Sequence, residues 1–306
     1  MPDLYMNTVA QIMDRGQFSN SYKFALLRSL AAFGRTPGSG EATVSTEWLA
    51  AKFVEFYWPL TMRFNIRQAT VPDKDPVVMG LIRGEAKACG LSPETNLIDY
   101  GKRFPDRYAS LLRRVAAKAF RDVIPRFHKV SRHSVEPRIY LETDDGIHVC
   151  REARKFLQSN HKTLDLLAVG SWVRFTEKFT SAPRLYEKIL GVAFKRSALK
   201  PYREFLQDSL NITTCFYCDK TIVGAPDVDH VIPWTFVADD KAWNLVLACR
   251  SCNGAKSSQT PDDRFIAKLD MQNQTMLGID VTELPKRIDQ DLADWQHGGL
   301  RQHTEM

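Results

Sequence analysis

The sequence lacks any long apolar run: none of its hydrophobic stretches reaches the ~18 residues that a membrane-spanning helix requires. The first residues, Met1 to Tyr5, do not combine a basic start with an apolar segment, so we expect no secretory signal. Internal repeats and low-complexity tracts are also missing. We therefore expect a cytoplasmic protein, and the length of 306 residues predicts about two domains.

Cysteine is scarce, with six residues in the chain. In a reducing cytosol we expect no disulfides, and Cys89 and Cys150 should be small buried apolar side chains. The other four form two C-x-x-C pairs: Cys215, Cys218, Cys249 and Cys252. Two such pairs are typical of a closed tetrahedral site for structural Zn²⁺, although two pairs could also arise by coincidence.

The net charge of +6 is distributed unevenly along the chain. Residues 1–134 carry 20 Lys and Arg against 12 Asp and Glu, whereas residues 211–306 carry 9 against 14. If the partner is a polyanion such as DNA, the first part of the chain must supply most of the electrostatic attraction.

We expect four regions in a mainly α multi-domain protein. Residues 1–134 should form a basic helical domain that recognises DNA or regulates the chain, with helices over 21–33, from a Ser45 cap to just before Pro59, and over about 75–88. Residues 135–210 should be mostly helical, with a hairpin turning at Asp145-Gly146 between 138–142 and 147–150, and helices over 151–158, 161–178, 183–190 and 200–209. Residues 211–275 should form a small α+β domain, followed by a helical tail over 276–306.

The segment Lys102 to Arg132 holds ten basic residues against two acidic ones. At ~100° per residue, one face of a helix starting near Pro105 would carry four cations. These are Arg107, Arg114, Lys118 and Arg121. We expect this face to contact phosphates, the alternative being an ordinary solvated helix face. The aromatic residues Phe104, Tyr108, Phe120 and Phe127 could stack on bases, but such residues more often belong to a core.

Between the cysteine pairs lies Asp229-His230, which a strand would direct to opposite faces. We therefore expect the aspartate to bind a metal ion and the histidine to transfer a proton, whereas alone the dipeptide would more often be structural. Asn253 follows the second cysteine pair, and Lys256 lies one helical turn later. An amide oxygen beside a cation suits a hard metal ion and a phosphate.

Together these residues resemble the zinc-bearing branch of the HNH endonucleases, also called the His-Me finger or ββα-metal fold. The resemblance spans about 45 residues and rests on one ordered set: Cys215, Cys218, Asp229, His230, Pro233, Trp234, Asn244, Cys249, Cys252, Asn253 and Lys256. It departs from a common family pattern at Asn253, where many members have a final histidine; this variant also occurs in the family and keeps an oxygen ligand.

The resemblance implies a role for each residue of the set. His230 would be the general base, and Asp229 and Asn253 would hold one Mg²⁺ or Mn²⁺ ion. Asn244 would pin the ββ loop and orient His230, and Lys256 would contact phosphate. The four cysteines would bind Zn²⁺ and stabilise the domain.

The expected activity is hydrolysis of DNA to a 5′-phosphate and a 3′-hydroxyl, with one strand cut per site. By analogy of layout with other nucleases, we expect a role in bacterial restriction or anti-phage defence, with a homodimer or other defence subunits as further partners. The alternatives are a homing or mobile-element nuclease, a nuclease that acts on RNA, and a non-catalytic zinc module that binds nucleic acid.

Overall fold

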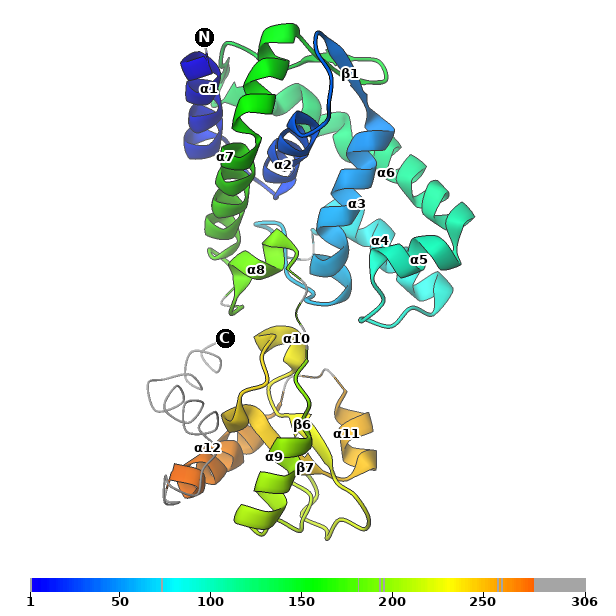
Figure 1. Ribbon diagram of the computed structural model, residues 1–306, viewed down its shortest axis with the longest axis vertical. Helices are drawn as coiled ribbons and strands as arrows, with labels where there is room; N and C mark the ends of the chain where they lie inside the picture. Colours follow the sequence, from blue (N-terminus) through cyan, green and yellow to red (C-terminus); the bar gives the residue numbers. More distant parts are fainter. Residues whose placement is uncertain are drawn as a thin grey trace. The chain divides into compact units, whose positions relative to one another are not determined.

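The computed structural model describes residues 2–72, 74–180, 182–192, 194, 196–257, 259 and 261–277. Most of the tail expected over 276–306 therefore lies outside the described residues. The chain divides into two compact units: residues 1–180 with 185–192, and residues 181–184 with 193–306 (Figure 1). Among the described residues, every helix is too short or too polar to cross a bilayer.

The first unit is built almost entirely from helices. Its helices are α1 (Pro2–Arg15), α2 (Tyr22–Gly34), α3 (Thr46–Met62), α4 (Val77–Cys89), α5 (Leu97–Arg103), α6 (Pro105–Arg126), α7 (Arg151–Thr176) and α8 (Leu185–Leu190). Helix α2 is buried on nearly all of its surface and packs mainly against α7 (Figure 1). A mainly apolar helix that is buried on nearly every side belongs in a core, so α2 is the central element of this unit.

A small antiparallel sheet closes one edge of the first unit, in the order β1 (Ala42–Ser45), β5 (Gly146–Val149), β4 (Leu141–Thr143). The predicted hairpin is confirmed, but its turn lies at Asp144-Asp145, because Gly146 already pairs with Thr143. A Cβ on Gly146 would lie 2.1 Å from the carbonyl oxygen of Val44. Glycine is therefore required by the close approach of β1 rather than by the turn. A second hairpin joins β2 (Lys129–Val130) and β3 (His133–Ser134).

Two helix boundaries differ from those expected. Helix α3 continues through Pro59 to Met62, because Trp58 and Leu60 are buried on either side of the proline and their burial offsets its cost of about 3 kcal/mol. The two helices expected over 151–158 and 161–178 are the single helix α7. Between the two expected ranges, Asn160 donates its amide to the carbonyl of Phe156 at 2.9 Å within that helix.

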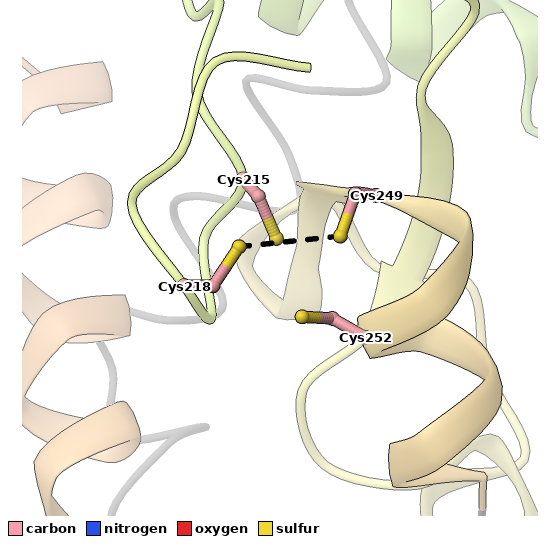
Figure 2. A group of neighbouring side chains, drawn as sticks. All are labelled: Cys215, Cys218, Cys249 and Cys252. Atoms are coloured by element: carbon pink, nitrogen blue, oxygen red, sulfur yellow. Dashed lines mark hydrogen bonds between the residues drawn. The ribbon is translucent and has the colours of Figure 1, made fainter. Parts of the chain in front are cut away.

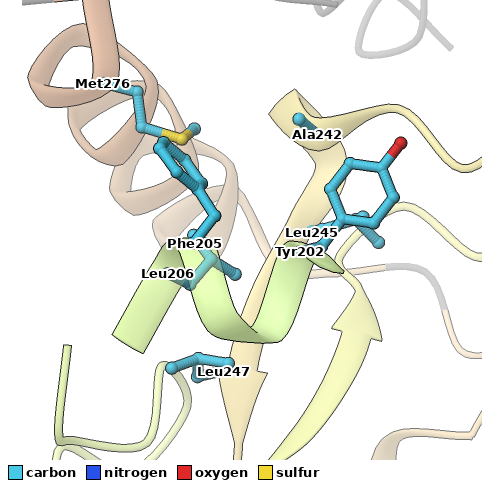
Figure 3. Packing of buried hydrophobic residues seen from close by; sticks show 7 residues of the cluster. All are labelled: Tyr202, Phe205, Leu206, Ala242, Leu245, Leu247 and Met276. Carbon is cyan, nitrogen blue, oxygen red and sulfur yellow. The ribbon is translucent and has the colours of Figure 1, made fainter. Parts of the chain in front are cut away.

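The second unit is a small α+β domain. It consists of α9 (Lys200–Glu204) with a π-helical turn (Phe205–Ser209), β6 (Asp227–His230), α10 (Trp234–Val237), a 3₁₀ turn (Ala242–Asn244), β7 (Leu245–Ala248), α11 (Arg250–Lys256) and α12 (Asp263–Leu277). Strand β7 is buried along its whole length. Leu245 and Leu247 belong to one hydrophobic cluster with Phe205 and Met276 (Figure 3). Val246 belongs to a second hydrophobic cluster on the other face of β7.

The fold class expected from the sequence is confirmed: the chain is mainly α, with a small α+β domain near its C-terminus.

Candidate metal centre and nuclease site

The four cysteines predicted to bind zinc lie together in the second unit (Figure 2). Their Sγ atoms all lie within 4.8 Å of one another, and those of Cys218 and Cys249 are 4.0 Å apart. A tetrahedron with Zn–S bonds of about 2.3 Å has sulfur atoms about 3.8 Å apart. The cluster therefore has the dimensions and the donor chemistry of a tetrahedral metal site.

Local backbone structure positions both cysteine pairs. The first pair lies in a tight turn, in which Cys215 N–H donates to the carbonyl of Lys220 and Asp219 N–H donates to the carbonyl of Cys215. In the second pair, Cys249 is the N-cap of α11, and Cys252 lies in its first turn. This arrangement brings a loop and a helix terminus to the same point.

The pKa values of the second cysteine pair also favour the binding of a cation. Hydrogen bonds from the Ser251 hydroxyl and the backbone N–H of Cys252 lower the pKa of Cys249 to about 6. The neighbouring Cys249 sulfur, in turn, raises the pKa of Cys252 to about 12. Four thiolates at this distance repel one another, so full ionisation requires a positive ion among them.

Strands β6 and β7 and helix α11 form a ββα unit. The strands pair antiparallel, with Asp229 opposite Val246 and His230 opposite Leu245. As expected for consecutive strand residues, the side chains of Asp229 and His230 take different partners. Both are nearly buried, with 9% and 5% of their surface exposed.

His230 forms a buried pair with Asp240. Its Nε2 lies 3.0 Å from Oδ1 of Asp240, whose other oxygen accepts the backbone N–H of Ser197 at 2.5 Å. Burial alone would raise the pKa of Asp240, but the hydrogen bonds from His230 and Ser197 lower it below its ordinary value. Asp240 is therefore a carboxylate, and it favours the proton on Nε2 of the imidazole.

Asn244 holds the segment that follows His230. Its Oδ1 accepts the backbone N–H of Ile232 at 2.8 Å, its Nδ2 donates to the carbonyl of the same residue at 2.9 Å, and its own carbonyl accepts the N–H of Val231 at 3.0 Å. These bonds tie the start of β7 to the end of β6, and they fix the backbone next to the histidine.

Oxygen groups gather where β6 meets α11. Asn253 donates its amide to Oδ2 of Asp227 at 3.1 Å. Asp229 accepts the hydroxyl proton of Tyr217 at 2.5 Å, and its Oδ2 lies 3.2 Å from Nζ of Lys256. Lys256 also donates to the carbonyl of His230 at 2.7 Å. The ammonium group predicted to contact phosphate is thus paired with the carboxylate predicted to bind metal.

Three residues of this site were missed by the sequence reasoning: Tyr217, Asp227 and Asp240. Strand alternation could have indicated Asp227, because it lies two residues before Asp229 and shares its face of β6. Tyr217 lies inside the first cysteine pair, and Asp240 lies in a turn between the strands. Neither has a local sequence signal for its contact, because each contact depends on the tertiary fold.

Two of the four cations on the predicted basic face of α6 form ion pairs within the first unit. Arg107 and Arg114 both bind the buried carboxylate of Glu85 on α4, which also accepts the hydroxyl proton of Tyr100. Lys118 and Arg121 are exposed.

The aromatic residues near α6 contribute mainly to packing. Phe120 and Phe127 are buried, while the rings of Phe104 and Tyr108 lie within about 6 Å of the ring of Tyr100.

The chain was compared with models of known protein families. A family model described as HNH endonuclease matches residues 215–262, the segment that holds the cysteine cluster, the ββα unit and the Asp229–His230 dipeptide. Searches of curated proteins and of solved structures gave no match. The family assignment made from the motif is therefore confirmed for this segment, and the second unit of the chain carries an HNH endonuclease domain.

Proposed function

We propose that the chain is a metal-dependent endonuclease that hydrolyses the phosphodiester bonds of DNA. The observation that carries this proposal is the meeting of a buried histidine–carboxylate pair and a group of oxygen ligands at one ββα unit, within the segment that matches the HNH family. A zinc module that only binds nucleic acid needs neither group.

His230 is proposed as the general base. With Asp240 accepting the proton of Nε2, the imidazole keeps a free lone pair on Nδ1, which can take a proton from an attacking water molecule. The carboxylate then stabilises the imidazolium that forms. Asn244 keeps the backbone beside the ring in place during this transfer.

Asp229 and Asn253 are proposed to hold one divalent cation, Mg²⁺ or Mn²⁺. Carboxylate and amide oxygens are the ligands that such hard cations prefer, so the residues present fit the ion. When bound, the cation stabilises the negative charge that develops on the leaving oxygen. Lys256 would exchange its contact with Asp229 for one with the substrate phosphate. Breaking of the bond between phosphorus and the O3′ leaving group would give products with a 5′-phosphate and a 3′-hydroxyl.

The cysteine cluster is proposed to hold structural Zn²⁺, with all four ligands supplied by the protein. The basic residues of α6, with Lys118 and Arg121 exposed, are proposed to add phosphate contacts.

One site cuts one strand, so a monomer would nick DNA, and a double-strand break would need two copies or two encounters. The proposed biological setting is restriction or defence against phage.

Cleavage of a supercoiled plasmid tests the proposal directly. The intact protein should nick the plasmid in the presence of Mg²⁺ or Mn²⁺, and His230→Ala should slow cleavage by about 10²- to 10⁴-fold because the general base is lost. His133→Ala is the matched control, because His133 is an exposed histidine of the first unit.

Equal activity of the His230→Ala and His133→Ala variants would remove His230 from the mechanism. Parallel assays on duplex DNA, single-stranded DNA and RNA define the substrate, and faster cleavage of RNA would overturn the assignment to DNA.

A further inference from the structure

A polar pocket of about 580 Å³ lies in the first unit, remote in sequence from the HNH segment. Its walls come from the loop before α2, the first turn of α2, the last turns of α6 and the β2–β3 hairpin. Its lining includes Phe18, Lys23, Thr70, Asp122, Arg126 and Lys129. A volume of this size suits a small organic ligand.

Lys23 is a buried cation at this pocket. Its side chain is 8% exposed, and its Nζ donates to the carbonyl of Lys129 at 2.9 Å and lies 5.7 Å from the centre of the Phe18 ring. Among the described residues, no carboxylate lies within ion-pairing distance of this ammonium. Burial lowers the pKa of Lys23 to about 8. An ammonium group has three donors, so Lys23 has capacity for an anionic acceptor.

The remaining charges of the pocket are also mainly positive. Arg126 and Lys129 are exposed, and Asp122 pairs with Arg126 at 3.2 Å. Three cations and one carboxylate therefore face a single cavity. Concave surfaces with one excess sign of charge concentrate counter-ions of the opposite sign.

The pocket wall is held by hydrogen bonds rather than being a loose loop. Thr70 donates its backbone N–H to the carbonyl of Ser19 at 3.0 Å, and Tyr22 donates its N–H to the side chain of Asn20 at 3.0 Å. The ring of Phe18 stacks on Phe24 with their centres 4.6 Å apart. A preformed wall lowers the entropy cost of binding a ligand.

We propose that this pocket binds the phosphate group of a nucleotide, with Lys23 at its base and Arg126 and Lys129 at its rim. The ligand class is a phosphate ester, because phosphate offers several acceptors to a set of converging cations. The half-buried ring of Phe18 supplies apolar surface for the rest of the ligand. A free nucleotide and a nucleotide within a nucleic-acid strand present the same chemistry.

Isothermal titration of the full chain without added divalent cation tests this site. The probes are inorganic phosphate, a nucleoside 5′-monophosphate and a single-stranded oligonucleotide. The double variant Arg126→Gln/Lys129→Gln should weaken binding of the mononucleotide about tenfold or more, because two charge-assisted contacts are lost. Arg113→Gln is the matched control, since Arg113 is an exposed arginine of α6 that does not line the pocket.

The Lys23→Met variant should abolish binding. Because Lys23 is buried, this variant could fail to fold, whereas Arg126 and Lys129 are exposed and their double variant should keep the fold. Tighter binding of the oligonucleotide than of the mononucleotide would assign the site to a strand, and the reverse would assign it to a free nucleotide. The proposal is overturned if none of the three probes binds, or if the double variant and Arg113→Gln bind equally well. Since no divalent cation is added, this result is independent of cleavage at the HNH domain.

Discussion

Asp229 and His230 are consecutive in the chain, yet each is controlled by a different neighbour. Asp229 accepts the hydroxyl of Tyr217, and His230 pairs with Asp240. The chemistry of each residue therefore depends on a side chain that lies outside strand β6. Substituting these neighbours changes the site without removing a proposed reacting group.

Asp240→Asn should lower kcat for DNA cleavage by about 10²-fold, because the amide neither fixes the imidazole tautomer nor stabilises the imidazolium. The KM for DNA should change little, since Asp240 is 2% exposed and does not face the solvent. Asp239→Asn is the matched control at the adjacent position. Steady-state kinetics on plasmid DNA measure the effect, and the same kcat in both variants would show that the pairing with His230 is not used.

Tyr217→Phe should raise the concentration of Mg²⁺ or Mn²⁺ needed for half-maximal cleavage about tenfold, because groups that orient a metal ligand commonly contribute 10- to 100-fold to affinity. The ring and its packing against Phe265 are kept, with only the hydroxyl removed. Cleavage rates across a series of metal concentrations measure the change. A metal dependence identical to that of the exposed control Tyr186→Phe would contradict it.

At the scale of single elements, helix α6 combines packing with charge. One face buries Leu111, Val115 and Ala119, while Arg107 and Arg114 bind Glu85 of α4. The hydrogen bonds from Tyr100 and the two arginines overcome the effect of burial and lower the pKa of Glu85. Part of the basic face predicted to contact DNA therefore also joins two helices.

Glu85→Gln should lower the free energy of unfolding of the first unit by about 1–3 kcal/mol at pH 7, because the charged acceptor of these bonds is lost. A lowered pKa stabilises the fold above the ordinary pKa of the carboxyl group, and this contribution is lost as the pH falls through the lowered value. The difference from the unmodified protein should therefore shrink in acid. Urea unfolding at pH 7 and near pH 3 measures it, and a constant difference would be inconsistent with the ionised pair.

The elements with strong local signals were predicted well from the sequence. Ser45 caps α3 by accepting the N–H of Trp48, Gly90 ends α4 in a left-handed conformation, and Pro105 begins α6. Helix α1, by contrast, was not delimited, and the turn of the β4–β5 hairpin was displaced by one residue. That displacement follows from a contact between Gly146 and β1, which lies about 100 residues away in the chain and leaves no local pattern.

The residues of the candidate site were likewise predicted only in part from the sequence. The spacing of the cysteines and of Asp229, His230, Asn244 and Asn253 was visible in the sequence, because the HNH motif is short and ordered. The partners Tyr217 and Asp240 were not, because a tyrosine and an aspartate in loops are common residues with many uses. The geometry of the ββα unit was needed to bring them to the site.

At the scale of the whole molecule, the chain has two units with separate cores. The second unit depends on short strands, two small hydrophobic clusters and a cysteine cluster. We expect a domain with so small a core to gain much of its stability from a metal ion bound at the proposed zinc site. We expect no such dependence in the first unit, whose described helices bury many large apolar side chains.

Cys249→Ser should therefore unfold the second unit selectively. We expect loss of about one bound zinc ion per chain and loss of one thermal transition, with the transition of the first unit retained. Differential scanning calorimetry with metal analysis measures both quantities. The control Cys89→Ser removes a thiol of the first unit and should keep the zinc content; an unchanged second transition in Cys249→Ser would refute a structural metal site.

Tyr217 lies between two cysteines of the cluster, and Asn253 directly follows another, so the contacts of Asp229 and Asp227 depend on residues next to the proposed zinc ligands. If zinc fills that cluster and the proposed nuclease activity holds, a newly made chain would be inactive until it binds the ion. Zinc depletion would then keep the proposed nuclease inactive without any inhibitor, and added zinc would activate existing chains without new synthesis.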